Sequence, residues 1–475
     1  MKRYSIFVLV LFIATFVSAQ KKSIAILSVN DMHASIERMP KFAAIVDSLR
    51  GIYPDLLIFS AGDNRTGNAL NDQHAEPSRP MTQLMNAVGF NASTIGNHEF
   101  DSKIDGFRTQ LIQSNFPYLC ANIEKHDSLR IFTYPYKIFE VDGVKIGVLG
   151  IVQTGANNVP DTHPSNVKGI NFPDEIETIS KYSWLRDHCD VEILLTHCGY
   201  ENDTIFARKF PHYDAIIGGH SHTRVGDNQI HNGVLITQAE NKLKCATLSV
   251  FVVENGKVIE KTSKLINVAN YNKENSEIAA MVKEYSNNPE LKKVLTQVAT
   301  PFTKYEELGC MMTDALCAQL KCDVALQNSG GVRYDSLAVG PMTVDDALRL
   351  DPFGNEAVLV KLNGKELADL LIDCRRIDEL RVAYVSGIKY TITYSKSNPE
   401  KVISIKLFDE NGKKLDMNKE YVVAMNSYIS SMVTFEHRNP FENVYKPCSD
   451  LMMDYLRAQK SISYQGITRV TEIAK

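Results

Sequence analysis

Histidine, aspartate and asparagine residues that could bind metal ions occur in five short groups in the first half of the chain. Each group directly follows an apolar run of strand length. A single Asp or His after a strand is usually a turn former or a paired polar group. Five groups at the same point after five strands are a pattern that turns alone do not produce. The groups are Asn30-Asp31-Met32-His33, Ala61-Gly62-Asp63-Asn64, Gly96-Asn97-His98-Glu99-Phe100-Asp101, Thr196-His197 and Gly218-Gly219-His220-Ser221-His222.

The residue types in these groups favour a site for divalent cations. Carboxylates, imidazoles and an amide oxygen suit borderline to hard ions, among them Zn, Mn, Fe and Co. Two such ions about 3.5–4 Å apart can hold both the attacking and the departing oxygen at a phosphorus atom. The chemistry that these groups indicate is therefore metal-assisted hydrolysis at phosphorus.

Two pairs of these residues are separated by a single position, Asp31-x-His33 and His220-x-His222. In a regular strand, residues two apart project from the same face. This regularity is lost where the strand ends, so the backbone must turn there to aim both side chains at one ion. We expect Gly218-Gly219 to permit that turn, because glycine adopts conformations closed to other residues.

The elements that must position these groups alternate between strands and helices from about residue 23 to residue 266. Such alternation favours an α/β domain with layered sheets. In α/β sheets ligands collect outside the carboxyl ends of the strands, so the five groups are expected to converge. The predicted strands are Ile24–Val29, Leu56–Phe59, Ile146–Val152, Val191–Leu195, Ala215–Ile217 and Val234–Ile236, and the predicted helices are Lys41–Leu49, Met81–Val88, Phe107–Gln113 and Ile176–Arg186.

The second half of the chain has a different pattern. Residues 268–298 are polar with periodic apolar positions, which predicts a helical linker. Beyond it strands follow one another with Gly-bearing turns, which is typical of an α+β domain. The predicted elements are the helices Glu306–Leu320 and Glu366–Cys374 and the strands Val324–Gln327, Val358–Leu362, Gly387–Tyr394, Ile403–Phe408 and Tyr421–Met425.

Length and composition fit a globular protein of more than one domain. The chain has 475 residues, above the roughly 250–300 at which single cores stop growing. A formal charge of −4 gives no basic field, which disfavours a nucleic acid polymer as partner. The nine cysteines include no Cys-x-x-Cys pair, so we read them as buried apolar residues and assign them no function.

The N-terminus resembles a cleavable export signal. Lys2 and Arg3 precede the apolar run Ile6–Val17, and small residues follow at Ser18-Ala19. The run is shorter than the ~20 residues of a membrane span, and no later segment is long and apolar enough for one. We therefore expect residues 1–19 to be removed and the product to be periplasmic or secreted, without a stable membrane span.

The five groups together resemble the signature blocks of the calcineurin-like metallophosphoesterases. The run from Gly96 to Asp101 and the second half of the chain resemble the bacterial periplasmic 5′-nucleotidase/UDP-sugar hydrolase family. The resemblance implies a four-layer α/β/β/α metallophosphoesterase domain at residues 20–267, the linker at 268–298, and an α+β substrate-binding domain at 299–475.

The resemblance also implies roles for the residues of the first domain. Two divalent metal ions are expected, with Asp63 bridging them. His98 would contact the departing ester oxygen and Asp101 would orient it, while a metal-activated hydroxide attacks phosphorus without a covalent enzyme intermediate. The implied metal ligands are Asp31, His33 and His222 for one ion, and Asn97, His197 and His220 for the other.

In the second domain the resemblance points to residues that hold a nucleotide. Asn328, Gly330, Gly331 and Arg333 match a block that grips the phosphate side of the substrate, and Phe353 matches one that stacks on the base. The family's Gly-Gly-Asp-Gly-aromatic block is absent here. Tyr428 or Phe435 is the candidate for the second stacking face, and the missing block keeps substrates other than nucleosides open.

These features predict an exported metal-dependent 5′-nucleotidase that releases phosphate from nucleoside 5′-monophosphates in nucleotide catabolism. UDP-sugars and 2′,3′-cyclic nucleotides are further candidate substrates. Two alternatives stay open. One is a metallophosphoesterase for a non-nucleotide ester, and the other is a non-catalytic nucleotide-binding surface protein, which would be recognised by a lost metal ligand. No predicted ligand is missing, and the sequence indicates neither the metal nor the oligomeric state.

Overall fold

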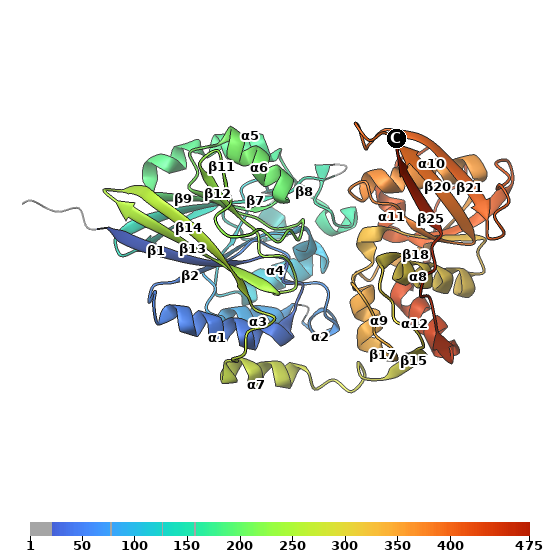
Figure 1. Cartoon of the computed structure of the whole chain (residues 1–475), viewed down its shortest axis with the longest axis horizontal. Helices are drawn as coiled ribbons and strands as arrows, with labels where there is room; N and C mark the ends of the chain where they lie inside the picture. Colours follow the sequence, from blue (N-terminus) through green and yellow to red (C-terminus); the bar gives the residue numbers. More distant parts are fainter. Residues whose placement is uncertain (1–20, 77, 126, 156–157) are drawn as a thin grey trace, which may run out of the picture.

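The computed structural model describes residues 21–76, 78–125, 127–155 and 158–475, which form two bodies side by side (Figure 1). The predicted signal segment, residues 1–19, lies outside the described residues. The first body runs from blue to yellow-green in Figure 1, and the second from yellow to red. Within the described part of the chain, no helix combines the length and the apolar composition that crossing a bilayer requires.

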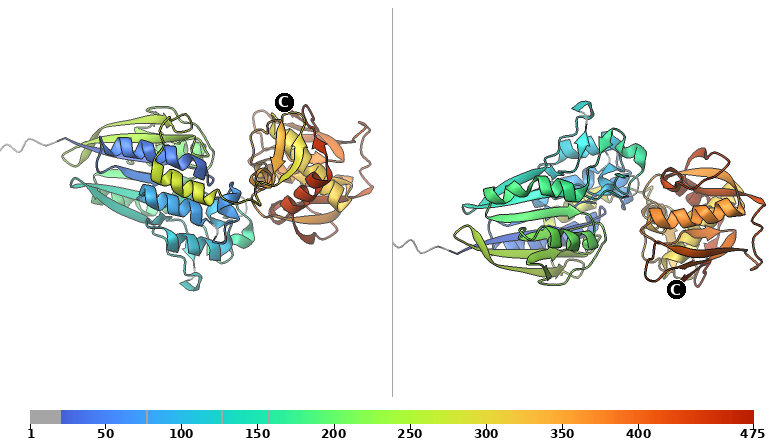
Figure 2. Two further views of the ribbon diagram at one scale, coloured as in Figure 1. Left: turned by 90° about the horizontal axis from the view of Figure 1, so that it is seen from below. Right: turned by 90° about the horizontal axis from the view of Figure 1, so that it is seen from above.

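Two six-stranded sheets lie face to face in the first body, with helices on both outer faces (Figure 2). Between the sheets lies an apolar layer with Ile26, Phe59 and Ile193 at its centre. In spatial order the first sheet is β14 (Lys257–Asn267), β13 (Cys245–Glu254), β1 (Lys22–Val29), β2 (Leu57–Ser60), β3 (Ala92–Thr94) and β4 (Tyr118–Leu119). The second is β11 (Ile230–His231), β12 (Val234–Thr237), β10 (Ala215–Ile217), β9 (Val191–His197), β7 (Val144–Val152) and β6 (Tyr136–Val141).

Helices with one apolar face cover each sheet. On the first sheet Phe42 and Ile45 of α1 pack with Leu84 of α3, and on the second Ile179 of α5 packs with Phe206 of α6. The predicted α/β/β/α layering is thus confirmed. The helices are α1 (Met39–Arg50), α2 (Ala69–Asp72), α3 (Arg79–Val88), α4 (Lys103–Gln113), α5 (Glu175–Lys181) and α6 (Tyr200–Lys209), and a small ladder joins β5 (Glu124–Lys125) to β8 (Ile170–Asn171).

Strand direction gathers the five polar groups at one side of the first body. β1, β2, β3 and β4 run parallel in the first sheet, and β7, β9, β10 and β12 run parallel in the second. Their carboxyl ends point toward the second body (Figure 1). The polar groups that follow these strands therefore lie where the two bodies meet.

The second body is α+β, as predicted. Its largest sheet is β19 (Tyr384–Ser386), β16 (Val324–Gln327), β22 (Glu420–Asn426), β18 (Glu356–Asn363) and β23 (Glu442–Pro447). Two three-stranded sheets join β21 (Val402–Asp409), β20 (Ile388–Tyr394) and β25 (Val470–Ala474), and β17 (Gly340–Thr343), β15 (Val294–Val298) and β24 (Ser461–Ile462). The helices are α8 (Tyr305–Leu320), α9 (Val344–Leu350), α10 (Gly364–Ile377), α11 (Ser427–Met432) and α12 (Cys448–Ala458).

The segment between the bodies differs from the expected continuous helical linker. Its helix, α7 (Ser276–Tyr285), packs Ile278 and Val282 on the first body. Val294–Val298 forms the strand β15 instead, paired with β17 and β24. The sequence pattern did not predict this strand, because both partners lie far along the chain and leave no local signal. The domain bounds of 20–267, 268–298 and 299–475 stay a prediction.

One further local prediction was wrong. Residues 176–186 do not form one helix, since α5 ends at Lys181 and a 3₁₀ helix follows at Ser183–His188. Tyr182 at the junction leaves the helical conformation, and its ring packs with Tyr136 and Trp184. Tertiary aromatic packing outweighs the helical periodicity here.

Glu192 on β9 makes the stability of the fold depend on pH. Its carboxylate is buried, neither oxygen has a hydrogen-bond partner among the described residues, and burial raises its pKa from 4.5 to about 8. Because this folded-state pKa lies above that of the unfolded chain, the proton that Glu192 holds stabilises the fold at low pH. That stability is lost progressively as pH rises from the lower value toward the higher one.

We therefore expect Glu192→Gln to raise the melting temperature relative to wild type near pH 8, and to change it little near pH 5. The exposed Glu140→Gln on β6 is the matched control. Thermal unfolding of the three proteins across this pH range measures the difference. Equal melting temperatures near pH 8 would contradict this account of Glu192.

Candidate metal centre

The polar groups at the strand ends converge on one site between the two sheets. Asp63 Oδ2 lies 3.1 Å from His197 Nε2, although the two residues come from different sheets. Among the described residues, four sets of possible ligand atoms lie within 4.8 Å of one another. They are those of Asp31, His33 and His222, of His33, Asp63 and His98, of Asp31, Asp63 and His197, and of Asp161, His220 and Glu379. Asp63 is thus within reach of both His33 and His197, as a bridging role demands.

Ring nitrogens and carboxylates face one another in this cluster. His33 Nε2 lies 3.1 Å from His222 Nε2, which in turn lies 3.3 Å from Asp31 Oδ1. A few ångströms away, Asn97 Oδ1 lies 3.2 Å from His197 Nε2 and 3.1 Å from His220 Nδ1. The side chains therefore form two adjacent groups of atoms that carry lone pairs.

In His33 and His197, the ring nitrogen that points away from the cluster forms a hydrogen bond, and this bond decides which nitrogen carries the proton. His33 Nδ1 lies 2.9 Å from the carbonyl oxygen of Thr66, and His197 Nδ1 lies 2.6 Å from that of Ala61. A carbonyl oxygen only accepts, so Nδ1–H must donate in both cases. The Nε2 lone pairs of His33 and His197 are then directed into the cluster, the arrangement that metal-bound histidines show.

The backbone turns at the ligand residues themselves. Left-handed φ angles, which are uncommon for residues other than glycine and concentrate at functional sites, occur at five of them. Asp31, His33, Asp63, His220 and His222 have φ of 47°, 45°, 53°, 79° and 55°. This is how residues two apart in sequence can aim at one place.

The prediction that Gly218-Gly219 supplies the turn was wrong. Neither glycine has a positive φ among those that the structure records. Their role is close packing, since a Cβ on Gly218 would lie 2.0 Å from Asp203 Oδ2, and one on Gly219 would lie 2.6 Å from the carbonyl oxygen of Ala61.

A buried carboxylate, Glu99, ties two of the ligand loops together. It accepts hydrogen bonds from the backbone N–H groups of Asp63 at 2.9 Å, Asn64 at 2.9 Å and Gly96 at 2.7 Å. The sequence contained Glu99 within the Gly96–Asp101 group, but its structural role was missed, because backbone partners leave no pattern in the side chains.

His98 lies beside the cluster and is oriented by Asp101. His98 Nδ1 donates to Asp101 Oδ2 at 2.8 Å, so its Nε2 is the nitrogen left to face the cavity, 3.8 Å from Asp63 Oδ2. Burial of the ring lowers its pKa, but the carboxylates of Asp63 and Asp101 outweigh burial, and the pKa of His98 is raised. The ring can therefore carry a proton next to the cluster.

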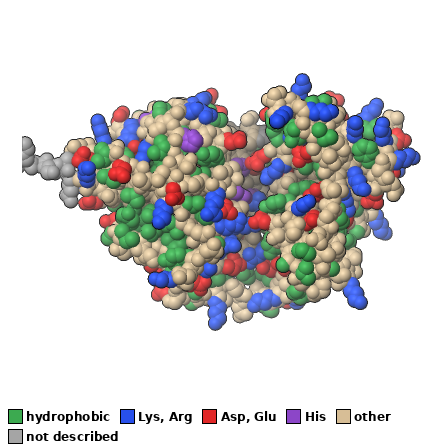
Figure 3. Space-filling view, viewed as in Figure 1, with side chains coloured by type: hydrophobic (Ala, Val, Ile, Leu, Met, Phe, Trp, Pro, Cys, Tyr) green, Lys and Arg blue, Asp and Glu red, His purple; other side chains and the backbone are tan. Residues whose placement is uncertain are grey.

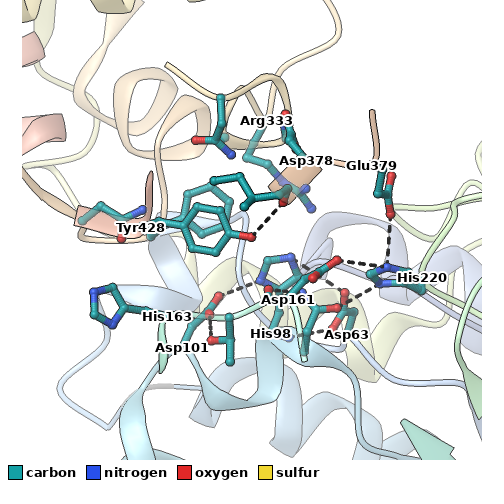
Figure 4. A pocket seen from close by; sticks show the side chains of 18 of the residues that line it. Asp63, His98, Asp101, Asp161, His163, His220, Arg333, Asp378, Glu379 and Tyr428 are labelled. Carbon is teal, nitrogen blue, oxygen red and sulfur yellow. Dashed lines mark hydrogen bonds and ion pairs between the residues drawn. The ribbon is translucent and has the colours of Figure 1, made fainter. Parts of the chain in front are cut away.

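The second body completes the cavity around these residues (Figure 4). Arg333 Nη2 lies 2.9 Å from His33 Nε2, and the ring of Phe353 stacks on His98 with centroids 5.6 Å apart. Figure 3 shows histidine side chains in the hollow between the bodies. All six substrate-binding candidates line the cavity, namely Asn328, Gly330, Gly331, Arg333, Phe353 and Tyr428.

The two candidates for a second aromatic face separate in space. Tyr428 lines the cavity, and its hydroxyl donates to the carbonyl oxygen of Ile377 at 3.4 Å. Phe435 instead packs against His437 and Phe441, with ring centroids 4.9 and 6.5 Å away. Of the two, Tyr428 is the one in position to face Phe353 across the cavity.

Several cavity residues were missed by sequence reasoning. Glu379 Oε1 lies 3.2 Å and Asp161 Oδ2 lies 3.5 Å from His220 Nε2, and Asp378 accepts from the backbone N–H of Gly330 at 3.0 Å. These acidic residues lie in loops outside the five sequence groups that predicted the metal ligands. Only the folded arrangement brings them to the site.

Two family models match the chain. One is "calcineurin-like phosphoesterase" over residues 24–224, and the other is "5′-nucleotidase, C-terminal domain" over residues 287–434. The order and position of these matches agree with the two bodies of the structure. The chain belongs to the two-domain 5′-nucleotidase family.

Similar proteins agree with membership of the 5′-nucleotidase family. A 5′-nucleotidase of Vibrio cholerae is 29% identical, with 78% of this chain and 80% of the relative covered. A trifunctional nucleotide phosphoesterase of Bacillus subtilis is 26% identical over 86% of this chain, but the chain spans only 32% of that longer protein. The solved 5′-nucleotidase precursor from Thermus thermophilus has the same fold, with a TM-score of 0.84 and 22% identity over 95% of this chain and 99% of that one.

As a member of this family, the chain is a metal-dependent phosphohydrolase, and the cluster fits divalent ions. His222 Nε2 lies 3.1 Å from His33 Nε2 and 3.3 Å from Asp31 Oδ1, so one divalent cation can take a donor atom from each of these three residues. Asp31 and Asp63 are buried, and buried carboxylates are usually paired or bound to metal. The set of nitrogen and oxygen donors suits borderline divalent ions.

Gly62 allows the metal loops to approach one another, and a methyl group there should be costly. Its φ is +86°, and a Cβ would lie 2.7 Å from Gly96 N and 2.8 Å from His197 Nδ1. We expect Gly62→Ala to lower the free energy of unfolding by roughly 2–4 kcal/mol.

Urea unfolding of Gly62→Ala and of the control Gly226→Ala tests this. A Cβ at Gly226 meets nothing within 4 Å, so the control should stay close to wild type. Equal stability of the two variants would show that the loops around His197 tolerate rearrangement.

Proposed function

We propose that this chain is an exported two-metal 5′-nucleotidase that releases phosphate from nucleoside 5′-monophosphates. One observation carries the proposal. A single cavity is lined by the cluster residues Asp63, Asn97, His220 and His222 and by His98 from the first body, and by Arg333, Phe353 and Tyr428 from the second. A substrate with a phosphate at one end and a flat base at the other fits those groups. UDP-sugars and 2′,3′-cyclic nucleotides are further substrates to test.

In this proposal seven side chains hold two divalent ions. The first ion takes Asp31, His33 and His222, the second takes Asn97, His197 and His220, and Asp63 binds both. Bound ions of this kind supply charge stabilisation and a nucleophilic water at phosphorus. The support is the proximity of the donor atoms, with Asn97 Oδ1 near two rings and Asp31 Oδ1 near a third.

Arg333 and His98 are proposed to act on the substrate itself. The Arg333 guanidinium reaches 2.9 Å from His33 Nε2, so it lies beside the metal centre, where a phosphate group would be held. A planar guanidinium binds phosphate oxygens in a forked geometry. His98, held by Asp101, would donate its Nε2 proton to the departing ester oxygen.

The aromatic side chains are proposed to hold the base. Phe353 lies between the Arg333 guanidinium, 5.7 Å from its ring centroid, and His98, while Tyr428 approaches the same cavity from α11. Since chemistry is on one body and base recognition on the other, we propose that closure of the two bodies accompanies each turnover.

A substrate panel with metal-stripped enzyme tests the function. We expect no turnover of AMP after chelation, and recovery on adding Mn, Co, Zn or Fe. The panel compares AMP, UDP-glucose, 2′,3′-cyclic AMP and p-nitrophenyl phosphate by kcat/KM. If p-nitrophenyl phosphate is the best substrate by a wide margin, the alternative of a non-nucleotide esterase replaces the proposal.

The role of the base contact is tested by Tyr428→Leu. Stacking is worth about 1–3 kcal/mol per base, so KM for AMP should rise roughly tenfold or more. KM for p-nitrophenyl phosphate, which has no base, should change much less than KM for AMP. A parallel change in both would mean that Tyr428 shapes the whole cavity rather than recognising the base.

The role of His98 is tested by His98→Ala. We expect the variant to bind metal like wild type, while kcat for AMP falls by roughly 10²–10⁴ because proton transfer to the leaving oxygen is lost. His231→Ala, whose ring contacts Tyr200 at the start of α6, is the control. Metal content is measured on the same samples, and unchanged kcat in His98→Ala would refute the assigned role.

A further inference from the structure

All nine cysteines lie in the described part of the chain, and one pair of their sulfur atoms is in contact. Cys317 Sγ and Cys322 Sγ lie 2.9 Å apart. Cys317 is in the last turn of α8, and Cys322 comes just before β16. Lys321 between them has a left-handed φ of 52°, and a helix that ends this way brings the following residue back against the last turn.

The surroundings of this pair differ from those of the other cysteines. Both side chains are half-buried at the edge of an apolar cluster that includes Leu316 and Ala325, so a small reagent can reach them. The contact between the two thiols lowers the pKa of Cys317 and raises the pKa of Cys322. Cys317 is thus the better nucleophile of the two.

We propose that Cys317 and Cys322 form a disulfide by exchange with a disulfide donor, either oxidised glutathione or an oxidising protein disulfide. The Cys317 thiolate attacks one donor sulfur and expels a donor thiolate. Cys322 then loses its proton, attacks the Cys317 sulfur of the mixed disulfide and expels the second donor thiolate. Two protein thiols are oxidised, and one donor disulfide is reduced to two thiols.

The bond would join the end of α8 to the start of β16. The other end of β16 continues into the loop of Asn328 and Arg333, which lines the cavity. Oxidation therefore restrains the strand from which the substrate-binding loop begins. This proposal stands independently of the proposed function, because it concerns thiols outside the cavity.

Thiol counting on the folded enzyme tests the proposal. The protein is incubated with oxidised glutathione, unfolded and alkylated, and the peptides are analysed by mass spectrometry. We expect seven of the nine cysteines to be alkylated, with 317 and 322 joined. Dithiothreitol should lower the melting temperature of the oxidised wild type by a few degrees and leave Cys317→Ser unaffected.

Cys189→Ser is the matched control, since Cys189 is also half-buried but its thiol donates to the carbonyl oxygen of Leu185. That variant should respond to dithiothreitol like wild type. Alkylation of all nine cysteines after glutathione treatment, or pairing of 317 or 322 with glutathione alone, would overturn the proposal.

A second, independent observation concerns the outer nitrogen of His220. Its Nδ1 faces Asn97 Oδ1, and its Nε2 faces two carboxylates, Glu379 Oε1 at 3.2 Å and, from its own body, Asp161 Oδ2 at 3.5 Å (Figure 4). The corresponding outer nitrogens of His33 and His197 meet backbone carbonyls of their own body. Glu379 instead comes from the second body, in a turn after α10 where Glu379 and Leu380 have left-handed φ of 50° and 64°.

We propose that Glu379 is a positioning residue for His220. When the bodies are closed, its carboxylate accepts the Nε2–H of His220 and keeps the Nδ1 lone pair directed at the cluster. Partners of this kind typically change metal affinity by about 10–100-fold. Because Glu379 leaves with the second body, ion affinity and closure are coupled. This inference rests on the ligand role proposed for His220.

Ion binding measured by calorimetry tests the coupling without relying on activity. We expect Glu379→Ala to bind the weaker of two Mn²⁺ ions about tenfold less tightly or worse. Glu379→Gln should recover much of the affinity, since its amide oxygen still accepts a hydrogen bond. Small-angle scattering should show Glu379→Ala more open than wild type in the presence of Mn²⁺.

The exposed Glu410→Ala is the control and should bind both ions like wild type. Wild-type affinity in Glu379→Ala, or equal affinities of the Ala and Gln variants, would overturn the positioning role. If Glu379→Ala loses affinity while wild type fails to hydrolyse AMP, the positioning role stands and the nucleotidase proposal fails.

Discussion

The central constraint on this structure is the crowding of buried carboxylates and imidazole lone pairs at one place. Asp31 and Asp63 are almost fully buried, and the free nitrogens of three rings face them or one another. Burying such groups without positive charge is strongly unfavourable. The fold supports the crowding through parallel strands that end together, left-handed backbone at the ligands, and glycines where loops touch. Bound divalent cations would make this arrangement favourable.

Side chains of the second body contact the same cluster of carboxylates and imidazoles. Arg333 brings a guanidinium to His33, and Glu379 brings a carboxylate to His220. Further contacts join the two bodies, since Arg349 donates to Asn68 Oδ1 at 2.9 Å and Lys242 Nζ donates to the carbonyl oxygen of Arg333 at 2.8 Å. The substrate groups of one body therefore lie beside the metal groups of the other in this structure.

Much of the site could be predicted from the sequence because its ligands follow strands. Strand periodicity located β1, β2, β9 and β10, and the carboxyl-end rule then brought Asp31, Asp63 and His197 together. The two-domain layout and the α/β/β/α layering came from the same patterns and from the family resemblance. Asp63 lies as close to His197 as a shared ion demands.

The rest depends on contacts that leave no local signal. Glu99 acts through backbone N–H groups, and Glu379 lies far from any metal motif in sequence. The turn at Asp31 and His220 arises from strained φ angles rather than from the adjacent glycines. β15 was missed since its partners are distant strands, and the contact of Cys317 with Cys322 depends on how α8 ends.

The central claim is most directly tested by counting bound metal. Wild-type protein and Asp63→Asn are saturated with Mn²⁺, freed of excess ion, and analysed by elemental mass spectrometry together with anomalous diffraction. The account predicts two ions per wild-type chain, on either side of Asp63, and weakened retention of both in the variant. A wild-type chain that holds at most one ion, or an Asp63→Asn chain that keeps both, would contradict it.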